Sequence, residues 1–314
     1  MLAAVMTTGA APVLESFDSP VASEGAALIE VSAAALARFD IAVASGRHYI
    51  RPPAGRFVLG REGVGRLADG RRVYFNCQSC LWPFGSMAER TLVDPQCVLE
   101  VPDGPSDELA AALGNAGLAA WLPLSWRARL APGETVLVIG ATGLSGLIAV
   151  AAARLLGAGR IVAAGRNPEA LEHCRALGAD AIVNLGDAAD LAAAYASAAG
   201  GPIDVALDYL CGPPAEAALE ALGKGGRIVH IGTTVEAAMK LPGQSLRRTS
   251  ADIMGFAYYH APIAVQQAAY AALCLHAAAG RIHIDIETLP LGDIRQAWDR
   301  QLAGSRTRLV LTPR

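Results

Sequence analysis

A strand that runs directly into a glycine-rich turn and then into a helix constrains this chain most. Residues 135–140 read TVLVIG, residues 140–146 read GATGLSG, and apolar residues at helical spacing follow. Strand-like and helix-like segments then alternate through RIVAAG, PEALEHCRALG, AIVNL, DVALDYL and GRIVHIG. Such alternation requires right-handed crossovers and predicts a doubly wound parallel sheet. We therefore expect a Rossmann-type α/β domain over residues 117–251.

The turn matches the phosphate-binding pattern of dinucleotide-binding domains with one change, since the usual G-x-G-x-x-G begins here with Ala141. Gly143 would let the backbone approach a pyrophosphate, Gly146 would let helix and strand pack closely, and the helix N-terminus offers N–H donors. A tight turn without a ligand is the alternative. The residues expected to contact the cofactor here are Ala141, Thr142, Gly143, Leu144, Ser145 and Gly146.

The end of the next strand predicts which dinucleotide binds. NAD-dependent enzymes normally place Asp or Glu there, whereas this chain has Gly165, Arg166 and Asn167. A carboxylate repels the 2′-phosphate of NADP and an arginine binds it, so the sequence favours NADPH; the alternative is a solvated turn. Ligands bind over the carboxyl ends of parallel strands. We therefore also expect cofactor contacts from Asp208, Gly232, Thr233 and Phe256.

The rest of the chain has a different pattern. Residues 1–116 contain short β-rich segments broken by Gly, Pro and Asp, such as GVGRLA and RRVYF, which predict a partly open antiparallel barrel. Residues 252–314 are too few for an independent core, so we expect them to rejoin the first domain.

Composition narrows the class of function. With 314 residues, 53% of them hydrophobic, the chain is long enough for buried cores. A net charge of −3 argues against nucleic-acid or membrane partners and leaves a small-molecule substrate. The sequence shows no signal peptide and no membrane span, and its six scattered cysteines do not form a disulfide framework, so we expect a cytoplasmic protein with reduced thiols.

Several motifs, in order and spacing, resemble one family. ALARFDIAVASGRHYIRPPAGRFVLGREGVG, GSMAERTLV, AALGNAGLAAW, LAPGETVLVIGATGLSG, LGADAIVNL and RLVLTP are similar to segments of the medium-chain dehydrogenase/reductase superfamily, in particular its zinc-free quinone oxidoreductase branch. The resemblance spans nearly the whole chain. It implies a GroES-like β-barrel domain joined to a Rossmann domain, and a homodimer.

The resemblance also allows a comparison with zinc-dependent relatives. Their catalytic ligand positions fall here on Ala37, Arg61 and Asn115, of which the first two cannot bind zinc and the third is a poor ligand. Cys77 and Cys80 form a C-x-x-C pair without a second pair at zinc-site spacing, so we expect two thiols at the mouth of the substrate cleft. A metal or a redox-active dithiol is the alternative. We predict no metal site.

Two arginines stand beside acidic residues in these motifs. Arg38 and Arg61 could orient a substrate oxygen, but buried arginines are usually paired, so we expect ion pairs with Asp40 and Glu62.

Without a Lewis acid, hydride transfer needs an acceptor whose own conjugation takes up negative charge. Quinones and α,β-unsaturated carbonyls meet that condition. The resemblance suggests Tyr49, or His48 one residue earlier, as the proton donor, with Asn115 as a further catalytic candidate. We therefore predict an NADPH-dependent quinone or enone reductase. The alternatives are an enoyl-thioester reductase and a non-catalytic NADPH-binding regulatory protein.

Overall fold

The computed structural model describes residues 1–305 and 307–313, and divides into two compact units. Unit 1 comprises Met1–Asn115 and Pro262–Arg314, and unit 2 comprises Ala116–Ala261. Among the described residues, no helix combines the length and the apolar character needed to cross a membrane.

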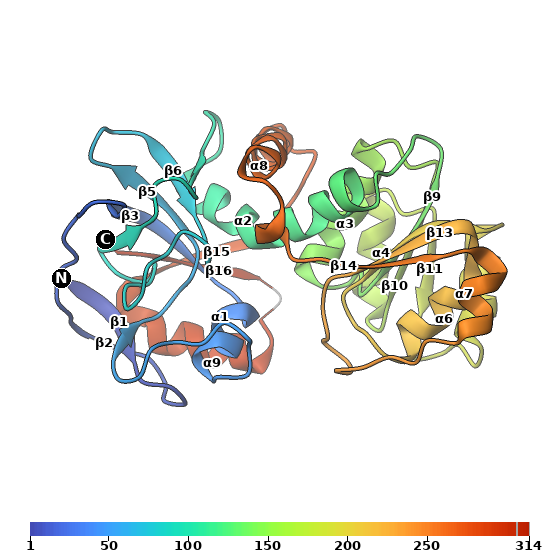
Figure 1. The fold of residues 1–314 in the computed structure, drawn as a ribbon, viewed down its shortest axis with the longest axis horizontal. Coiled ribbons are helices and arrows are strands. Elements are labelled where there is room, and N and C mark those ends of the chain that lie inside the picture. Colours follow the sequence, from blue (N-terminus) through green and yellow to red (C-terminus); the bar gives the residue numbers. More distant parts are fainter. Residues whose placement is uncertain (306, 314) are drawn as a thin grey trace. The chain divides into compact units, whose positions relative to one another are not determined.

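Unit 2 is a parallel α/β unit (Figure 1). Its sheet has the order β11-β10-β9-β12-β13-β14, and every pairing in it is parallel. The strands are β9 (Thr135–Ile139), β10 (Arg160–Gly165), β11 (Ala181–Asn184), β12 (Ile203–Asp208), β13 (Leu222–His230) and β14 (Asp252–Gly255). The helices between them are α3 (Leu144–Leu155), α4 (Pro168–Ala176), α5 (Leu191–Ala199), α6 (Pro213–Ala221) and α7 (Gly243–Thr249).

The strand order of unit 2 reverses between β9 and β12, the two central strands. Their apolar side chains are buried almost without interruption, which a sheet covered on both faces requires. The predicted doubly wound sheet is therefore present. The end of this unit was misplaced, because residues 252–261 were assigned to the return segment. They include β14, which pairs with β13 from Arg227↔Asp252 to His230↔Gly255, so unit 2 extends to Ala261.

Unit 1 is built from two sheets, one of three strands in the order β2-β1-β4 and one of seven in which β15-β16-β3-β5-β6-β8 form a path and β7 pairs with β3. Most of its pairings are antiparallel, and β15 with β16 is parallel. The strands are β1 (Leu2–Met6), β2 (Val13–Ser16), β3 (Ala27–Leu36), β4 (Phe57–Val58), β5 (Gly63–Leu67), β6 (Arg72–Phe75), β7 (Arg90–Val93), β8 (Leu99–Glu100), β15 (Ile286–Pro290) and β16 (Arg308–Thr312).

Helices and the end of the chain complete unit 1. Its helices are α1 (Arg38–Ala44), α8 (Ile263–Ala278) and α9 (Ile294–Ala303), and α2 (Asp107–Leu122) crosses the boundary between the units. Strand β16 pairs with β3, and Trp298 of α9 packs in the same core as Leu36 and Phe75. The last part of the chain thus rejoins the first domain.

Candidate functional site

The glycine-rich turn of unit 2 lies between β9 and α3, with Gly143 as the N-cap of the helix. A Cβ on Gly146 would lie 2.3 Å from the carbonyl oxygen of Gly140, so this position has no room for a side chain. A Cβ on Gly143 would meet only that oxygen, at 3.6 Å, and the backbone there has an ordinary φ of −85°. Gly146 therefore serves the packing of the turn, while Gly143 leaves space over the helix N-terminus.

The end of β10 lies against this turn. A Cβ on Gly165 would come within 2.4 Å of the Thr142 side chain, so strand and turn approach closely. Arg166 is exposed, and no described residue forms a hydrogen bond or ion pair with it. Asn167 caps α4, because its side chain accepts a hydrogen bond of 2.9 Å from the backbone N–H of Ala170. Of Gly165, Arg166 and Asn167, Arg166 therefore has a free cationic group that could bind a ligand.

The ends of β12 and β13 carry an interacting pair, Asp208 and His230. The sequence predicted Asp208 as a cofactor contact but did not indicate His230. The carboxylate of Asp208, fully buried, lies 2.7 Å from Nδ1 of His230. The backbone N–H of Gly232 donates to the carbonyl oxygen of Asp208, and that of Phe256 to the carbonyl oxygen of His230. Thr233 is exposed. Because the register of β12 against β13 shifts between Ile203 and Val205, counting residues along the two strands would not have placed His230 beside Asp208.

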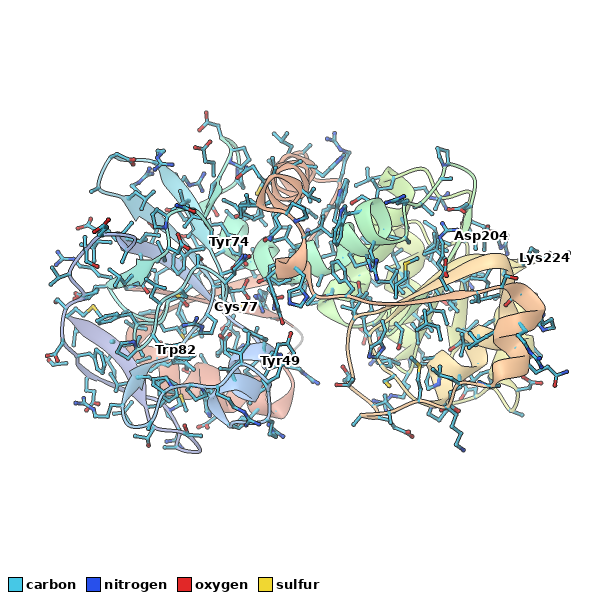
Figure 2. The ribbon with its side chains drawn as sticks, in the orientation of Figure 1. Tyr49, Tyr74, Cys77, Trp82, Asp204 and Lys224 are labelled. Atoms are coloured by element: carbon cyan, nitrogen blue, oxygen red, sulfur yellow. The ribbon has the colours of Figure 1, made fainter. Side chains whose placement is uncertain are left out.

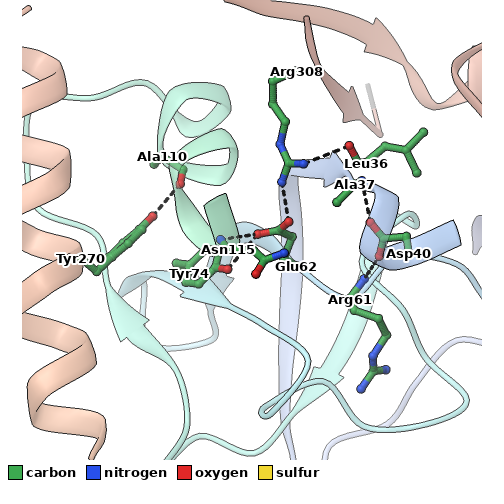
Figure 3. A network of polar contacts seen from close by, with 10 residues as sticks. All are labelled: Leu36, Ala37, Asp40, Arg61, Glu62, Tyr74, Ala110, Asn115, Tyr270 and Arg308. Atoms are coloured by element: carbon green, nitrogen blue, oxygen red, sulfur yellow. Dashed lines mark hydrogen bonds and ion pairs between the residues drawn. The ribbon is translucent and has the colours of Figure 1, made fainter. Parts of the chain in front are cut away.

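A buried polar network in unit 1 centres on Glu62 (Figure 3). One oxygen of Glu62 lies 2.5 Å from Nη2 of Arg308, and the other accepts hydrogen bonds from the Tyr74 hydroxyl at 2.9 Å and the Asn115 backbone N–H at 2.8 Å. Arg308 also donates to the carbonyl oxygen of Leu36. The network ties β5, β6, α2 and β16 together.

The predicted ion pairs of Arg38 and Arg61 are wrong. Glu62 takes its cation from Arg308, at the far end of the sequence. Asp40 accepts hydrogen bonds from the backbone N–H groups of Ala37 and Arg61, at 2.8 and 2.9 Å, rather than from a guanidinium. Burial, and then the charge of Glu62, raise the pKa of Asp40 to about 7.

The Arg61 guanidinium points away from both carboxylates. It lies 4.0 Å from the centre of the Trp82 ring and donates to the carbonyl oxygens of Cys77 and Cys80. Arg61 is 3% exposed, and the Trp82 ring and two main-chain acceptors on Nη2 compensate its burial in part, since Nε and Nη1 are buried without a hydrogen-bond partner among the described residues. The expected zinc-ligand position at residue 61 is thus occupied by a buried positive charge.

The rings of the two candidate proton donors contact each other at a tilt of 34°. The rings of His48 and Tyr49 lie 4.0 Å apart, and Nδ1 of His48 accepts a hydrogen bond from the backbone N–H of Ile50. Burial lowers the pKa of His48, and burial and then the nearby Cys77 raise the pKa of Tyr49. Tyr49 is 66% exposed, and Figure 2 labels it among the side chains of unit 1. Both residues are therefore neutral donors at neutral pH, His48 through Nε2 and Tyr49 through its hydroxyl.

The remaining candidates of unit 1 differ in accessibility. The side chain of Asn115 is half-buried and forms no hydrogen bond with any described residue, so its amide remains a potential donor. Cys80 is buried, which raises the pKa of its thiol, and Cys77 is half-buried. All six cysteines are free thiols.

Comparison with known proteins places this chain in a family. Residues 146–274 match the family model of zinc-binding dehydrogenases. The crystal structure of the quinone oxidoreductase from Thermus thermophilus is 30% identical, with a TM-score of 0.78 over 99% of this chain and 100% of that one. The chain belongs to the medium-chain dehydrogenase/reductase superfamily, in its quinone oxidoreductase-like branch. The predicted family is confirmed, and so is the fold class of a GroES-like β-barrel domain plus a Rossmann domain.

Two further relatives of this quinone oxidoreductase-like chain differ greatly in length. Quinone oxidoreductase-like protein 2 of Mus musculus is 29% identical over 257 residues, which are 78% of this chain and 72% of that one. Polyketide synthase GfsB of Streptomyces halstedii is 39% identical over 181 residues, 58% of this chain. The chain spans only 3% of that polyketide synthase.

The name of the matching family raises the question of zinc. At the expected ligand positions Ala37 has only a methyl group, Arg61 has a buried cation that repels a metal ion, and Asn115 is a weak ligand. Across the described residues, no cluster of three or more His, Cys, Asp or Glu is placed to hold a metal. The side chains at these three positions therefore do not fit a zinc ion.

Proposed function

We propose that this protein is an NADPH-dependent reductase that transfers a hydride to a quinone or an α,β-unsaturated carbonyl without zinc. The observation that carries the proposal is the replacement of the zinc ligands by Ala37, Arg61 and Asn115 in a chain that keeps the dinucleotide-binding turn. Without a metal to polarise the substrate, the acceptor must itself delocalise the incoming charge, as quinones and enones do.

The residues of unit 2 fit a dinucleotide phosphate. Gly143 leaves space for a pyrophosphate at the N-terminus of α3, where backbone N–H groups and the helix dipole favour an anion. Arg166 offers an unpaired guanidinium beside Gly165 for the 2′-phosphate. The Thermus thermophilus relative forms a complex with NADPH, which supports the same cofactor here. When bound, NADPH supplies the hydride.

In unit 1, we assign proton delivery to Tyr49. Its hydroxyl is exposed, and a pKa above the ordinary value keeps it protonated at neutral pH. His48 supports the Tyr49 ring by a tilted ring contact, and the Asn115 amide is a second donor to the oxygen that becomes negative during reduction.

An enoyl-thioester reductase is the second candidate function, because the chain matches a segment of a polyketide synthase. An enoyl-thioester reductase would transfer a hydride and a proton as a quinone or enone reductase does, but to a different acceptor. A non-catalytic NADPH-binding protein is the third candidate.

The deciding experiment follows NADPH oxidation against a panel of quinones, enones and enoyl thioesters, with added chelator. We expect turnover that survives chelation, and the preferred acceptor identifies the class. Tyr49→Phe removes the donated proton and should lower kcat by roughly 10²-fold while leaving NADPH affinity unchanged. Binding without turnover would instead support the non-catalytic function, and loss of activity with chelator would contradict the metal-free proposal.

Arg166 should determine the preference for NADPH. We expect Arg166→Ala to weaken NADPH binding by about 10- to 100-fold, because charge-assisted hydrogen bonds to the 2′-phosphate are lost. NADH lacks that phosphate, so its affinity should not change. Titration of both nucleotides checks this, with Arg175→Ala, an exposed arginine on α4, as the control. Equal losses of affinity for NADPH and NADH would show that Arg166 does not bind the 2′-phosphate.

We also propose a cytoplasmic homodimer. The free thiols agree with a reducing compartment. Strand β14 ends the sheet of unit 2, and no described strand pairs with its outer edge, which is suited to a second copy. Light scattering that gives twice the 32.4 kDa mass of one chain would support the dimer, and a single-chain mass would contradict it.

A further inference from the structure

His230 is held in one orientation at the end of β13. Nδ1 of its ring lies 2.7 Å from one carboxylate oxygen of Asp208, and the other oxygen accepts 2.9 Å hydrogen bonds from the backbone N–H groups of Leu210 and Cys211. Asp208 is fully buried, whereas 25% of the His230 side chain is exposed. The carboxylate is thus fixed by the main chain, and it fixes the imidazole in turn.

This contact determines the role of each ring nitrogen. An ionised carboxylate only accepts hydrogen bonds, so Nδ1 of His230 carries a proton. No described residue forms a hydrogen bond with Nε2 of His230. That nitrogen is an acceptor when the ring is neutral and a donor when it is protonated. Nε2 of His230, at the ends of the strands, is therefore the one atom of the pair that changes between acceptor and donor with protonation.

Asp208 is the charged group that controls His230. The hydrogen bond to Asp208 raises the pKa of His230 above its ordinary value, although burial opposes the shift. The other neighbouring strand, β14, places Gly255 opposite His230. Arg227, three residues before His230 on β13, is paired with Glu134, and Arg127 donates to the carbonyl oxygen of Gly255.

The charged groups of the adjacent loop and helices are engaged or exposed. Glu216 and Glu220 of α6 accept hydrogen bonds from the Lys240 backbone and from Ser245, Arg248 of α7 donates to the Glu220 carbonyl oxygen, and Arg247 and Glu236 are exposed. None of them contributes to the shift in the pKa of His230.

The position of the pair relates it to the cofactor site. In a doubly wound sheet a dinucleotide lies across the carboxyl ends of the strands where the strand order reverses, here between β9 and β12. Its pyrophosphate is expected at the N-terminus of α3, which follows β9, and its adenosine ribose beyond β10. The nicotinamide half then falls on the side of β12 and β13, where Asp208 and His230 lie.

We propose that His230 discriminates between the reduced and oxidised cofactor through its charge, an inference that rests on the proposed NADPH-dependent function. Loss of a hydride converts the neutral dihydronicotinamide ring into a cation. The Asp208–His230 pair is negative when His230 is neutral and then attracts that cation, whereas protonation of His230 offsets the charge of Asp208 and removes this attraction; the neutral ring is affected in neither case. Protonation of His230 therefore favours NADPH over NADP⁺ and promotes release of the oxidised product.

The test measures the dissociation constants of NADPH and NADP⁺ between about pH 5 and 8, the range in which histidine titrates. The 2′-phosphate also titrates there, but it is common to both nucleotides, so the ratio of the two constants removes its effect. We expect Kd(NADP⁺)/Kd(NADPH) to rise about tenfold towards low pH. Gln cannot be protonated, so His230→Gln should make the ratio independent of pH. The control His173→Gln, at an exposed histidine, should keep the pH dependence of the wild type. NMR titration of the His230 ring should give the same midpoint.

Different outcomes separate this inference from the function on which it rests. Binding of both nucleotides with a ratio that does not change with pH, or a change that persists in His230→Gln, would overturn the role of His230 and leave NADPH dependence intact. Failure of the wild-type protein to bind either nucleotide at any pH would overturn both.

Discussion

Replacing Arg308 with methionine is expected to destabilise unit 1 by about 3–5 kcal/mol, the usual effect of removing one partner from a buried ion pair. Arg308 and Glu62 have side-chain exposures of only 6% and 4%. Without the guanidinium, Glu62 keeps as donors, among the described residues, only the Tyr74 hydroxyl and the Asn115 backbone N–H. A buried negative charge would then have no counter-ion.

Urea unfolding followed by tryptophan fluorescence measures this effect, because Trp82 and Trp298 lie in unit 1. The matched control is Arg295→Met, which breaks the pair with Asp299, where both side chains are more than half exposed. That change should cost less than about 0.5 kcal/mol.

A second substitution tests the cause of the destabilisation. Adding Glu62→Gln to the Arg308→Met variant removes the uncompensated charge and should restore part of the stability. Similar losses for Arg308→Met and Arg295→Met would contradict the importance of the buried pair.

Alanine at two glycines of the same turn should separate an effect on folding from an effect on cofactor binding. Gly146→Ala places a Cβ 2.3 Å from the carbonyl oxygen of Gly140 and 2.6 Å from Cα of Ala141, so the main chain must move and unit 2 should lose stability. Gly143→Ala has room and an ordinary backbone conformation, so the melting temperature should stay unchanged. Its methyl group nevertheless occupies the surface expected to receive the pyrophosphate.

For Gly143→Ala we therefore expect NADPH affinity to fall by about 10- to 100-fold, the effect of weakening charge-assisted hydrogen bonds, in a fully folded protein. Fluorescence titration with NADPH and thermal unfolding of both variants provide the measurements. If Gly143→Ala bound NADPH like the wild type, the turn would be a packing feature and not a phosphate cradle.

The comparison of sequence and structure separates local from long-range features. The strand–turn–helix over 135–155 and the parallel sheet were predictable, because they depend on hydrophobic periodicity and on glycines within a few residues of each other. The same holds for the exposed position of Arg166 after β10. Residues 252–255 were assigned to the wrong unit, because so short a strand shows its partner only when it pairs with β13.

The polar contacts of the candidate site depend on pairings between distant residues. Asp40 and Glu62 were expected to bind arginines near them in the sequence, yet Glu62 binds Arg308, 246 residues away, and Asp40 binds main-chain N–H groups. Likewise, the register of β12 against β13 decides that His230 lies beside Asp208.

The sequence by itself therefore determined the family, the fold class and the position of the glycine-rich turn, since all of these follow from local patterns of residue type and spacing. Only the tertiary structure decided which buried charges are paired and which donors remain unpaired. The reason is physical: a buried ion needs a partner within a few ångströms, and the packing of strands and helices distant in the sequence determines which partner is that close.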